Sequence, residues 1–158
     1  MKSKDPFIEQ VQLEVIDIWH FGMSALFAHY DNVSDIADAI LIAWSAIENQ
    51  KLTVHQATEE LAWWCLMHKS FSANHFWQLL VAVELDFEQL FVAYVGKNVL
   101  NFFRQDNGYK DGSYIKLWDG KEDNQHLVEL TTELDTEADS FRDDLYNALS
   151  NRYQQLTG

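Results

Sequence analysis

The scarcity of helix-breaking residues constrains the fold of this chain more than any other feature of its sequence. The 158 residues include only one proline and six glycines. An all-β chain needs many such residues at its turns, so their scarcity favours long helices. We therefore predict an all-α fold, a helical bundle of about six to seven helices.

Apolar residues recur at helical spacing along most of the chain, and capping residues precede several of these segments. We expect a first helix over about 6–29, capped by Asp5, and a second after Ser34. The spacing of Thr53 and Gln56 is that of a capping box and predicts a third helix through about residue 68. Ser72 or Asn74 begins a fourth helix and Asp86 a fifth, and two more follow over about 124–133 and 137–154.

Two of these helices have a well-defined apolar face, which we expect to be buried. The face of the second consists of Ile36, Ala37, Ile40, Ala43, Trp44 and Ile47. The face of the fifth includes Leu90, Val92, Tyr94, Val95, Val99, Leu100 and Phe103.

The charge of the chain is strongly negative, with a formal net charge of −14 from 25 acidic and 11 basic residues. Such a surface repels phosphate backbones, so we do not expect a nucleic-acid polymer as a partner. The basic residues are nevertheless clustered, because five of the eleven fall within residues 97–121. They are Lys97, Arg104, Lys110, Lys116 and Lys121.

The remaining composition points to a soluble, cytoplasmic protein with a single domain over residues 1–158. The one cysteine, Cys65, cannot form an intramolecular disulfide, and its apolar neighbours predict a buried side chain. No signal-peptide pattern opens the chain, and no apolar run approaches the roughly 18 residues of a membrane-spanning helix.

A column of polar residues lies in the first predicted helix. Glu14, Asp17 and His20 are spaced three apart and share one helix face. Carboxylates held on a helix suit Mg²⁺, which prefers a few carboxylates together with substrate phosphates. The alternative is an ordinary solvated face of an acidic protein.

A cationic face lies near the end of the fifth predicted helix. Lys97, Asn101 and Arg104 occupy positions i, i+4 and i+7, so a cation, an amide and a guanidinium lie together. This arrangement suits phosphate oxygens, with arginine as a two-pronged donor. The alternative is that the two cations only complement the helix dipole.

Residues 105–124 interrupt the helical pattern and predict a long functional loop. Glycines alternate there with aromatic and basic side chains that could close over a nucleotide, and the alternative is a packed surface loop with incidental lysines. The candidate binding residues are Tyr109, Lys110, Tyr114 and Lys116.

At these residues the sequence resembles the dimeric all-α dUTPases, relatives of the MazG-like pyrophosphatases. The resemblance runs from about Pro6 to Leu130. It rests on Glu14-Val-Ile-Asp17-Ile-Trp-His-Phe21 and on residues 96–124, GKNVLNFFRQDNGYKDGSYIKLWDGKEDN.

The resemblance implies a homodimer that hydrolyses dUTP, and dUDP, to dUMP with release of pyrophosphate or phosphate. It implies Mg²⁺ ions held by two acidic pairs, of which the second matches Glu14 and Asp17 as catalytic and metal-binding residues. It also implies that substrate is bound by Lys97, Asn101, Arg104, Tyr109, Lys110, Tyr114 and Lys116.

The chain departs from the family pattern at its start. The family's early glutamine, which reads uracil, and its first acidic pair lie upstream of the segment that matches Glu14. Glu59 and Glu60 do not replace that pair, because no third acid follows them at the right place. Their distance from the segment that begins near Lys97 also aligns them with a different helix of the family. We therefore expect a truncated or divergent member, a homologue that binds nucleotide without catalysis, or one whose missing ligands come from another chain.

Two alternatives belong to other functional classes. Asp17 and His20 have the acid-x-x-His spacing of di-iron helical bundles, but Glu48, Glu84 and Glu88 lack the second histidine that such a site needs. Six tryptophans and ten phenylalanines could instead serve a non-catalytic helical interaction module.

Overall fold

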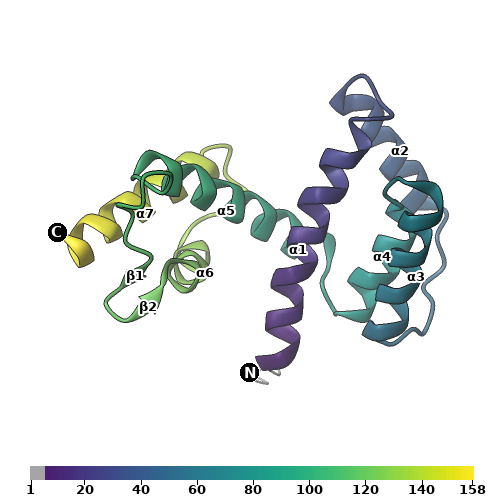
Figure 1. Ribbon diagram of the computed structural model, residues 1–158, viewed down its shortest axis with the longest axis horizontal. Coiled ribbons are helices and arrows are strands. Elements are labelled where there is room, and N and C mark those ends of the chain that lie inside the picture. Colours follow the sequence, from purple (N-terminus) through teal and green to yellow (C-terminus); the bar gives the residue numbers. More distant parts are fainter. Residues whose placement is uncertain (1–5) are drawn as a thin grey trace. The chain divides into compact units, whose positions relative to one another are not determined.

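The computed structural model describes residues 6–158, and its fold is all-α, as predicted (Figure 1). Seven helices and one two-stranded sheet form within these residues. The helices are α1 Pro6–Leu26, α2 Val33–Ser45, α3 Val54–His68, α4 Ala73–Ala82, α5 Phe87–Asp106, α6 Asp123–Glu133 and α7 Phe141–Thr157. The strands are β1 Leu117–Trp118 and β2 Lys121–Glu122. None of the described helices is long and apolar enough to span a membrane.

The chain divides into two compact units, and the boundary in the sequence falls within α5, between Leu90 and Phe91. The N-terminal unit contains α1 to α4, and the C-terminal unit contains most of α5 together with the strands, α6 and α7. The single domain expected from the sequence stays a prediction.

Aromatic side chains form the centre of the N-terminal unit. The Trp19 ring on α1 lies 5.7 Å from that of Trp44 on α2 and 5.0 Å from that of Phe76 on α4. Phe76 is fully buried. The buried Gln12 amide donates to the Val83 carbonyl at 2.7 Å, so this polar group in the core is satisfied.

Most predicted helix starts are confirmed. Thr53 forms the expected capping box with Gln56, and Ser72 caps α4. Asp86 and Gln89 exchange reciprocal side-chain bonds at the start of α5. The cap predicted at Asp5 lies outside the described residues.

The cap predicted for the second helix is wrong, because Asn32 takes the place assigned to Ser34. The Asn32 side chain accepts from the Asp35 amide at 2.9 Å and donates to the Asp35 carboxylate at 2.8 Å. Two bonds to Asp35 at the N3 position fix the helix start two residues earlier than a cap at Ser34 would.

The predicted burial of the second helix face and of Cys65 needs correction. Ile36 and Ile40 are buried on α2, but Ala37 is exposed. Cys65 is half-buried. α3 packs against the core through Ala57 and Leu61, and the apolar residues of its next turn lie less deeply.

The core of the C-terminal unit surrounds Trp118 and Phe103. Trp118 is fully buried, and its ring lies 5.9 Å from that of Phe103 on α5. The buried leucines of α7, Leu145 and Leu149, complete this core. The fifth-helix stripe is largely confirmed, since Val99, Leu100 and Phe103 are buried.

The segment predicted as one long loop is shorter and more ordered than expected. α5 continues to Asp106, and α6 already begins at Asp123. Between them β1 and β2 form an antiparallel hairpin whose turn residues, Asp119 and Gly120, have φ of 47° and 80°. Two positive φ values belong to the hairpin turn that matches strand twist. The last helix begins at Phe141 rather than near residue 137, after a stretch of turns.

Gly22 on α1 tests the packing of the N-terminal unit. A Cβ at this position would lie 2.5 Å from the buried Phe71 ring. We expect Gly22→Ala to lower the free energy of unfolding by about 1–3 kcal/mol through overpacking. Urea denaturation measures this change.

Gly96→Ala on α5 is the matched control. Its nearest neighbour, the Leu127 side chain, would lie at 3.5 Å, an ordinary contact. We expect a neutral effect or a gain of up to about 1 kcal/mol from helix propensity. Equal losses in the two variants would contradict the packing argument.

Candidate active site

The predicted acidic column is on α1, in the N-terminal unit. Glu14 is exposed and Asp17 half-buried, while Val15 and Ile16 beside them are buried. The half-buried His20 ring has Nδ1 3.1 Å from the carbonyl oxygen of Ile16. The apolar side of α1 thus fixes the helix and leaves the two carboxylates on the other side.

These two carboxylates offer a partial set of metal ligands. Among the described residues, no group of three or more His, Cys, Asp or Glu side chains could hold a metal ion. Mg²⁺ keeps several waters and is commonly bound through one or two carboxylates and substrate phosphates. Glu14 and Asp17 fit that kind of site.

The predicted cationic face is on α5, in the C-terminal unit, and its arginine is held firmly. Arg104 Nε donates to Asp123 Oδ2 and Nη2 donates to Asp123 Oδ1, both at 2.7 Å. The Asp123 side chain is 0% exposed and that of Arg104 is 15% exposed. This two-bond geometry is the strongest form of an arginine–carboxylate pair. Lys97 is half-buried and Asn101 exposed on the same helix.

Asp123 is the residue that sequence reasoning missed. Its carboxylate also accepts from Tyr114 Oη at 2.9 Å and from the Asn124 backbone amide at 2.8 Å. Burial lowers the pKa of Arg104, but the hydrogen bonds and charge of Asp123 outweigh it, so the net shift is upward. An acidic residue after the hairpin, at the first position of α6, was the only sequence signal.

Tyr114, predicted to close over substrate, is packed into the C-terminal unit. Its ring stacks on Tyr153 at 5.5 Å and 17°, and its hydroxyl donates to Asp123. Burial first, and then the bond to Asp123, raise the pKa of Tyr114 well above its usual value. The tyrosine therefore stays a donor over the whole physiological range.

The other loop residues lie at the surface. Tyr109 is 55% exposed, and the Arg104 guanidinium carbon lies 6.0 Å from its ring centre. Lys116 pairs with Glu122 at 3.4 Å, whereas the exposed Lys110 has no ion-pair partner among the side chains that the structure describes. Gly108 has φ of 89°, which glycine adopts readily, and the backbone there bonds to Ser113.

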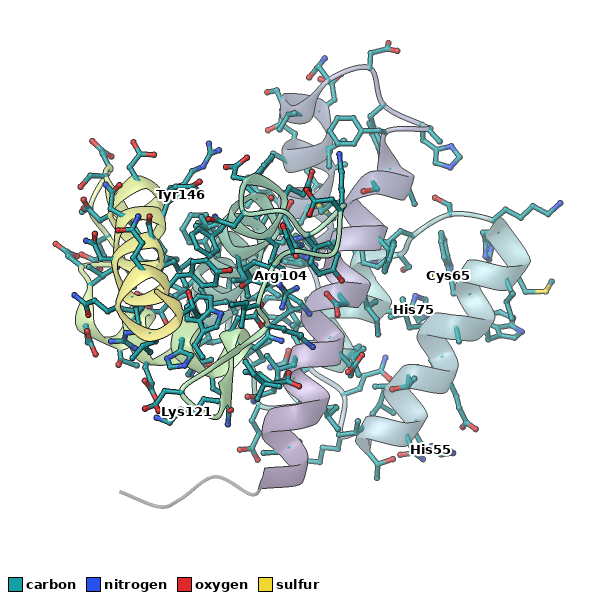
Figure 2. All side chains as sticks on the ribbon, turned by 60° about the vertical axis from the view of Figure 1, so that its left-hand side comes forward. His55, Cys65, His75, Arg104, Lys121 and Tyr146 are labelled. Atoms are coloured by element: carbon teal, nitrogen blue, oxygen red, sulfur yellow. The ribbon has the colours of Figure 1, made fainter. Side chains whose placement is uncertain are left out.

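Arg104 and Lys121, two of the five clustered basic residues, both lie in the C-terminal unit. Figure 2 shows Arg104 among many side chains of this unit, and Lys121 near the strands. Lys121 donates to Glu129 at 2.6 Å, so this base of the cluster is already paired.

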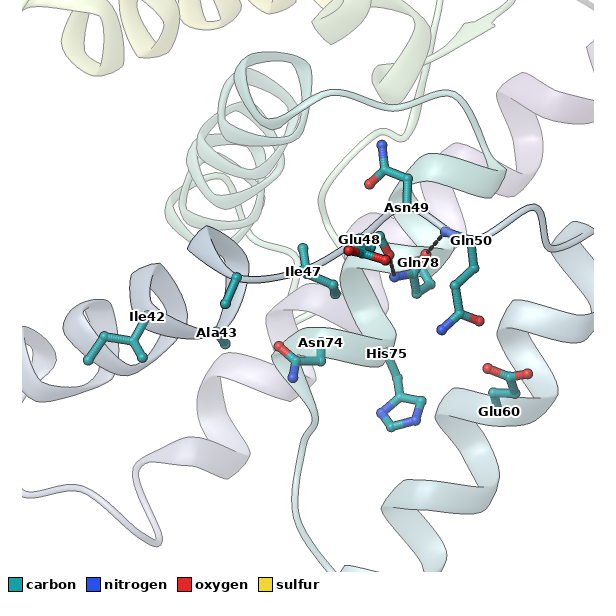
Figure 3. A pocket seen from close by; sticks show the side chains of 11 residues that line it. Ile42, Ala43, Ile47, Glu48, Asn49, Gln50, Glu60, Asn74, His75 and Gln78 are labelled. Atoms are coloured by element: carbon teal, nitrogen blue, oxygen red, sulfur yellow. Dashed lines mark hydrogen bonds between the residues drawn. The ribbon is translucent and has the colours of Figure 1, made fainter.

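A hollow of about 600 Å³ lies elsewhere, in the N-terminal unit, between α2, α3 and α4 (Figure 3). The buried Gln78 accepts from the Gln50 amide and donates to the Glu48 carbonyl, each at 2.9 Å, and so fixes the segment between α2 and α3. None of the candidate site residues lines this hollow.

Comparison with known proteins identifies the family. A family model described as dUTPase matches residues 1–109, more than half of the chain. The match includes Glu14, Asp17, Lys97, Asn101, Arg104 and Tyr109, and it ends before Lys110, Tyr114 and Lys116. A search of curated proteins found no match.

The raised pKa of Tyr114 predicts a loss of stability at alkaline pH. Above about pH 10 the unfolded chain releases this proton while the folded chain keeps it, so the free energy of unfolding falls as pH rises. The slope for one proton is about 1.4 kcal/mol per pH unit. We expect Tyr114→Phe to make the fall shallower by up to that amount, as measured by urea unfolding between about pH 9 and 11. Equal slopes in the two proteins would contradict this assignment.

Proposed function

The chain belongs to the all-α dUTPase family, and we propose that it hydrolyses dUTP, and dUDP, to dUMP with release of pyrophosphate or phosphate. The observation that carries this proposal is the family match over residues 1–109. That match includes both the acidic pair of α1 and the cationic face of α5.

We propose Mg²⁺ as the cofactor and Glu14 and Asp17 as its ligands. Both are carboxylates one turn apart on α1, the hard oxygen donors that this ion prefers. When bound, Mg²⁺ polarises phosphoryl oxygens and activates water for attack. The role of the protein is to hold the two carboxylates on a helix that Val15 and Ile16 anchor to the core.

The C-terminal unit supplies the groups that we propose bind the nucleotide. Lys97, Lys110 and Lys116 would bind phosphate oxygens as point charges, and Arg104 as a fixed planar donor. Such groups also stabilise the charge that develops in phosphoryl transfer. Asn101 and Tyr109, both exposed, would contact sugar or base.

We also propose a homodimer. α3 presents Trp63, Leu66 and Met67 on one face, with exposed fractions of 59%, 79% and 64%. Large apolar side chains gathered on one helix face commonly mark an interface between proteins.

A second candidate function is nucleotide binding without turnover. It is favoured by the metal ligands, because the described residues provide a pair of carboxylates and no larger group. Two carboxylates leave no obvious base for the attacking water.

The deciding measurement is pyrophosphate release from dUTP, beside dTTP and dCTP, with and without Mg²⁺. We expect Mg²⁺-dependent turnover that prefers dUTP and falls about 100-fold or more in Asp17→Ala, because a metal ligand supports several kcal/mol of transition-state stabilisation. Asp38→Ala, at an exposed aspartate of α2, is the matched control and should keep full activity.

The two candidate functions give different results in this assay. No turnover by a folded chain that still binds dUMP would favour the binding function. Turnover that does not depend on Mg²⁺ or on Asp17 would contradict the proposed site.

Lys110 and Lys121 allow a test of the lysines in the loop. Lys110 has no ion-pair partner among the described residues, whereas Lys121 is paired with Glu129. We expect Lys110→Met to raise KM for dUTP about 3–10-fold through the loss of a phosphate contact. Lys121→Met should leave KM unchanged, and steady-state kinetics compare the two. Equal effects would show that the loop acts through its overall charge.

A further inference from the structure

The carboxylate of Asp123 is fully buried, which is unusual for an acidic side chain in so small a unit. A buried carboxylate destabilises a fold unless charge and hydrogen bonds compensate it. Here the compensation is complete: two bonds come from Arg104, one from Tyr114 and one from the Asn124 backbone. An apolar side chain would fill the same volume without needing these four hydrogen bonds. We therefore look for the role of the carboxylate in what it does to Arg104 and Tyr114.

The way in which Asp123 binds Arg104 divides the guanidinium into two edges. Asp123 occupies the edge formed by Nε and Nη2. The second edge is formed by Nη1 and the remaining hydrogen of Nη2, and Asp123 does not occupy it. Nη1 donates a long hydrogen bond of 3.5 Å to Oδ1 of the exposed Asn101, a residue of the proposed site. A phosphate oxygen is a stronger acceptor than this amide oxygen and can replace it.

We propose that Asp123 is a positioning residue, which holds Arg104 so that its second edge binds the nucleotide's phosphate oxygens. This inference rests on the proposed function, because it needs Arg104 to bind substrate. Tyr114 supports the same role, since its hydroxyl bonds to Oδ2, the oxygen that receives Arg104 Nε. Asp123 itself does not touch substrate.

The charges agree with a geometric role. Arg104 and Asp123 together carry no net charge, so this pair attracts phosphate only weakly. Its contribution is to fix the orientation of the hydrogen bonds that Arg104 donates. The attraction comes from lysines that are less firmly held, such as the exposed Lys110. A donor fork fixed before binding loses little rotational freedom when substrate arrives, and this raises affinity.

The test measures binding of α,β-imido-dUTP with Mg²⁺ to the full chain by calorimetry. We expect Asp123→Asn to weaken binding about 10–100-fold, the usual effect of losing a residue that orients a binding group. Tyr114→Phe removes only the supporting bond and should weaken binding about 2–10-fold. Tyr146→Phe is the matched control: it removes the same atom from a bond to the exposed Asp106, and binding should not change.

A double-mutant cycle separates positioning from general support of the fold. If Asp123 acts through Arg104, adding Asp123→Asn to Arg104→Gln causes no further loss of affinity. Additive losses, or wild-type affinity in folded Asp123→Asn, would overturn the inference. If Asp123→Asn does not fold, the comparison of Tyr114→Phe with Tyr146→Phe decides. Equal affinities of these two variants for the analogue would overturn the inference.

Failure of the proposed function gives a separate result. A wild-type chain that neither binds the analogue nor hydrolyses dUTP would overturn that function, and this inference with it. A wild-type chain that binds, beside a Tyr114→Phe variant that binds equally well, would overturn the inference alone.

Discussion

The C-terminal unit depends on one buried ion pair, that of Arg104 and Asp123. Taking both charges out of water is expensive, and only close geometry with further hydrogen bonds offsets it. The pair has that geometry, with two bonds of 2.7 Å and a fully buried carboxylate. Because an unpaired charge in this place would be strongly destabilising, the end of α5 and the start of α6 must stay in register.

The same pair explains why the segment between α5 and α6 is ordered. Tyr114 reaches Asp123 through its hydroxyl and stacks on Tyr153 of α7, and Trp118 fills the space between the helices. The buried His126 stacks on Trp118 at 5.0 Å, with Nε2 2.9 Å from the Trp118 carbonyl oxygen. Residues rich in glycine and lysine thus become part of a core through their aromatic members, while the lysines stay at the surface.

Sequence reasoning recovered what is local and missed what is long-range. Periodicity and caps predicted α1, α3, α4 and α5 closely, because a helix stripe and a capping box are short-range patterns. The packing of the half-buried Tyr114 and the role of Asp123 could not be predicted in this way. Their partners come from other elements, and a tyrosine between glycines has the same pattern in a lid as in a core. The predicted burial of Cys65 was wrong for a related reason, since apolar neighbours in the sequence do not determine which face of the helix packs against the core.

The ion pairs also rank the basic residues by how freely they can exchange partners. The Lys116–Glu122 pair is half-exposed with a separation of 3.4 Å, so water and salt weaken it and a phosphate could replace the glutamate at little cost. Arg104 cannot exchange Asp123, because that would leave a buried carboxylate alone. On the proposed function, a chain of net charge −14 would bind its anionic substrate in two steps of different character. Exchangeable lysines would attract the substrate, and an arginine that its buried partner has already oriented would fix where the phosphate oxygens lie.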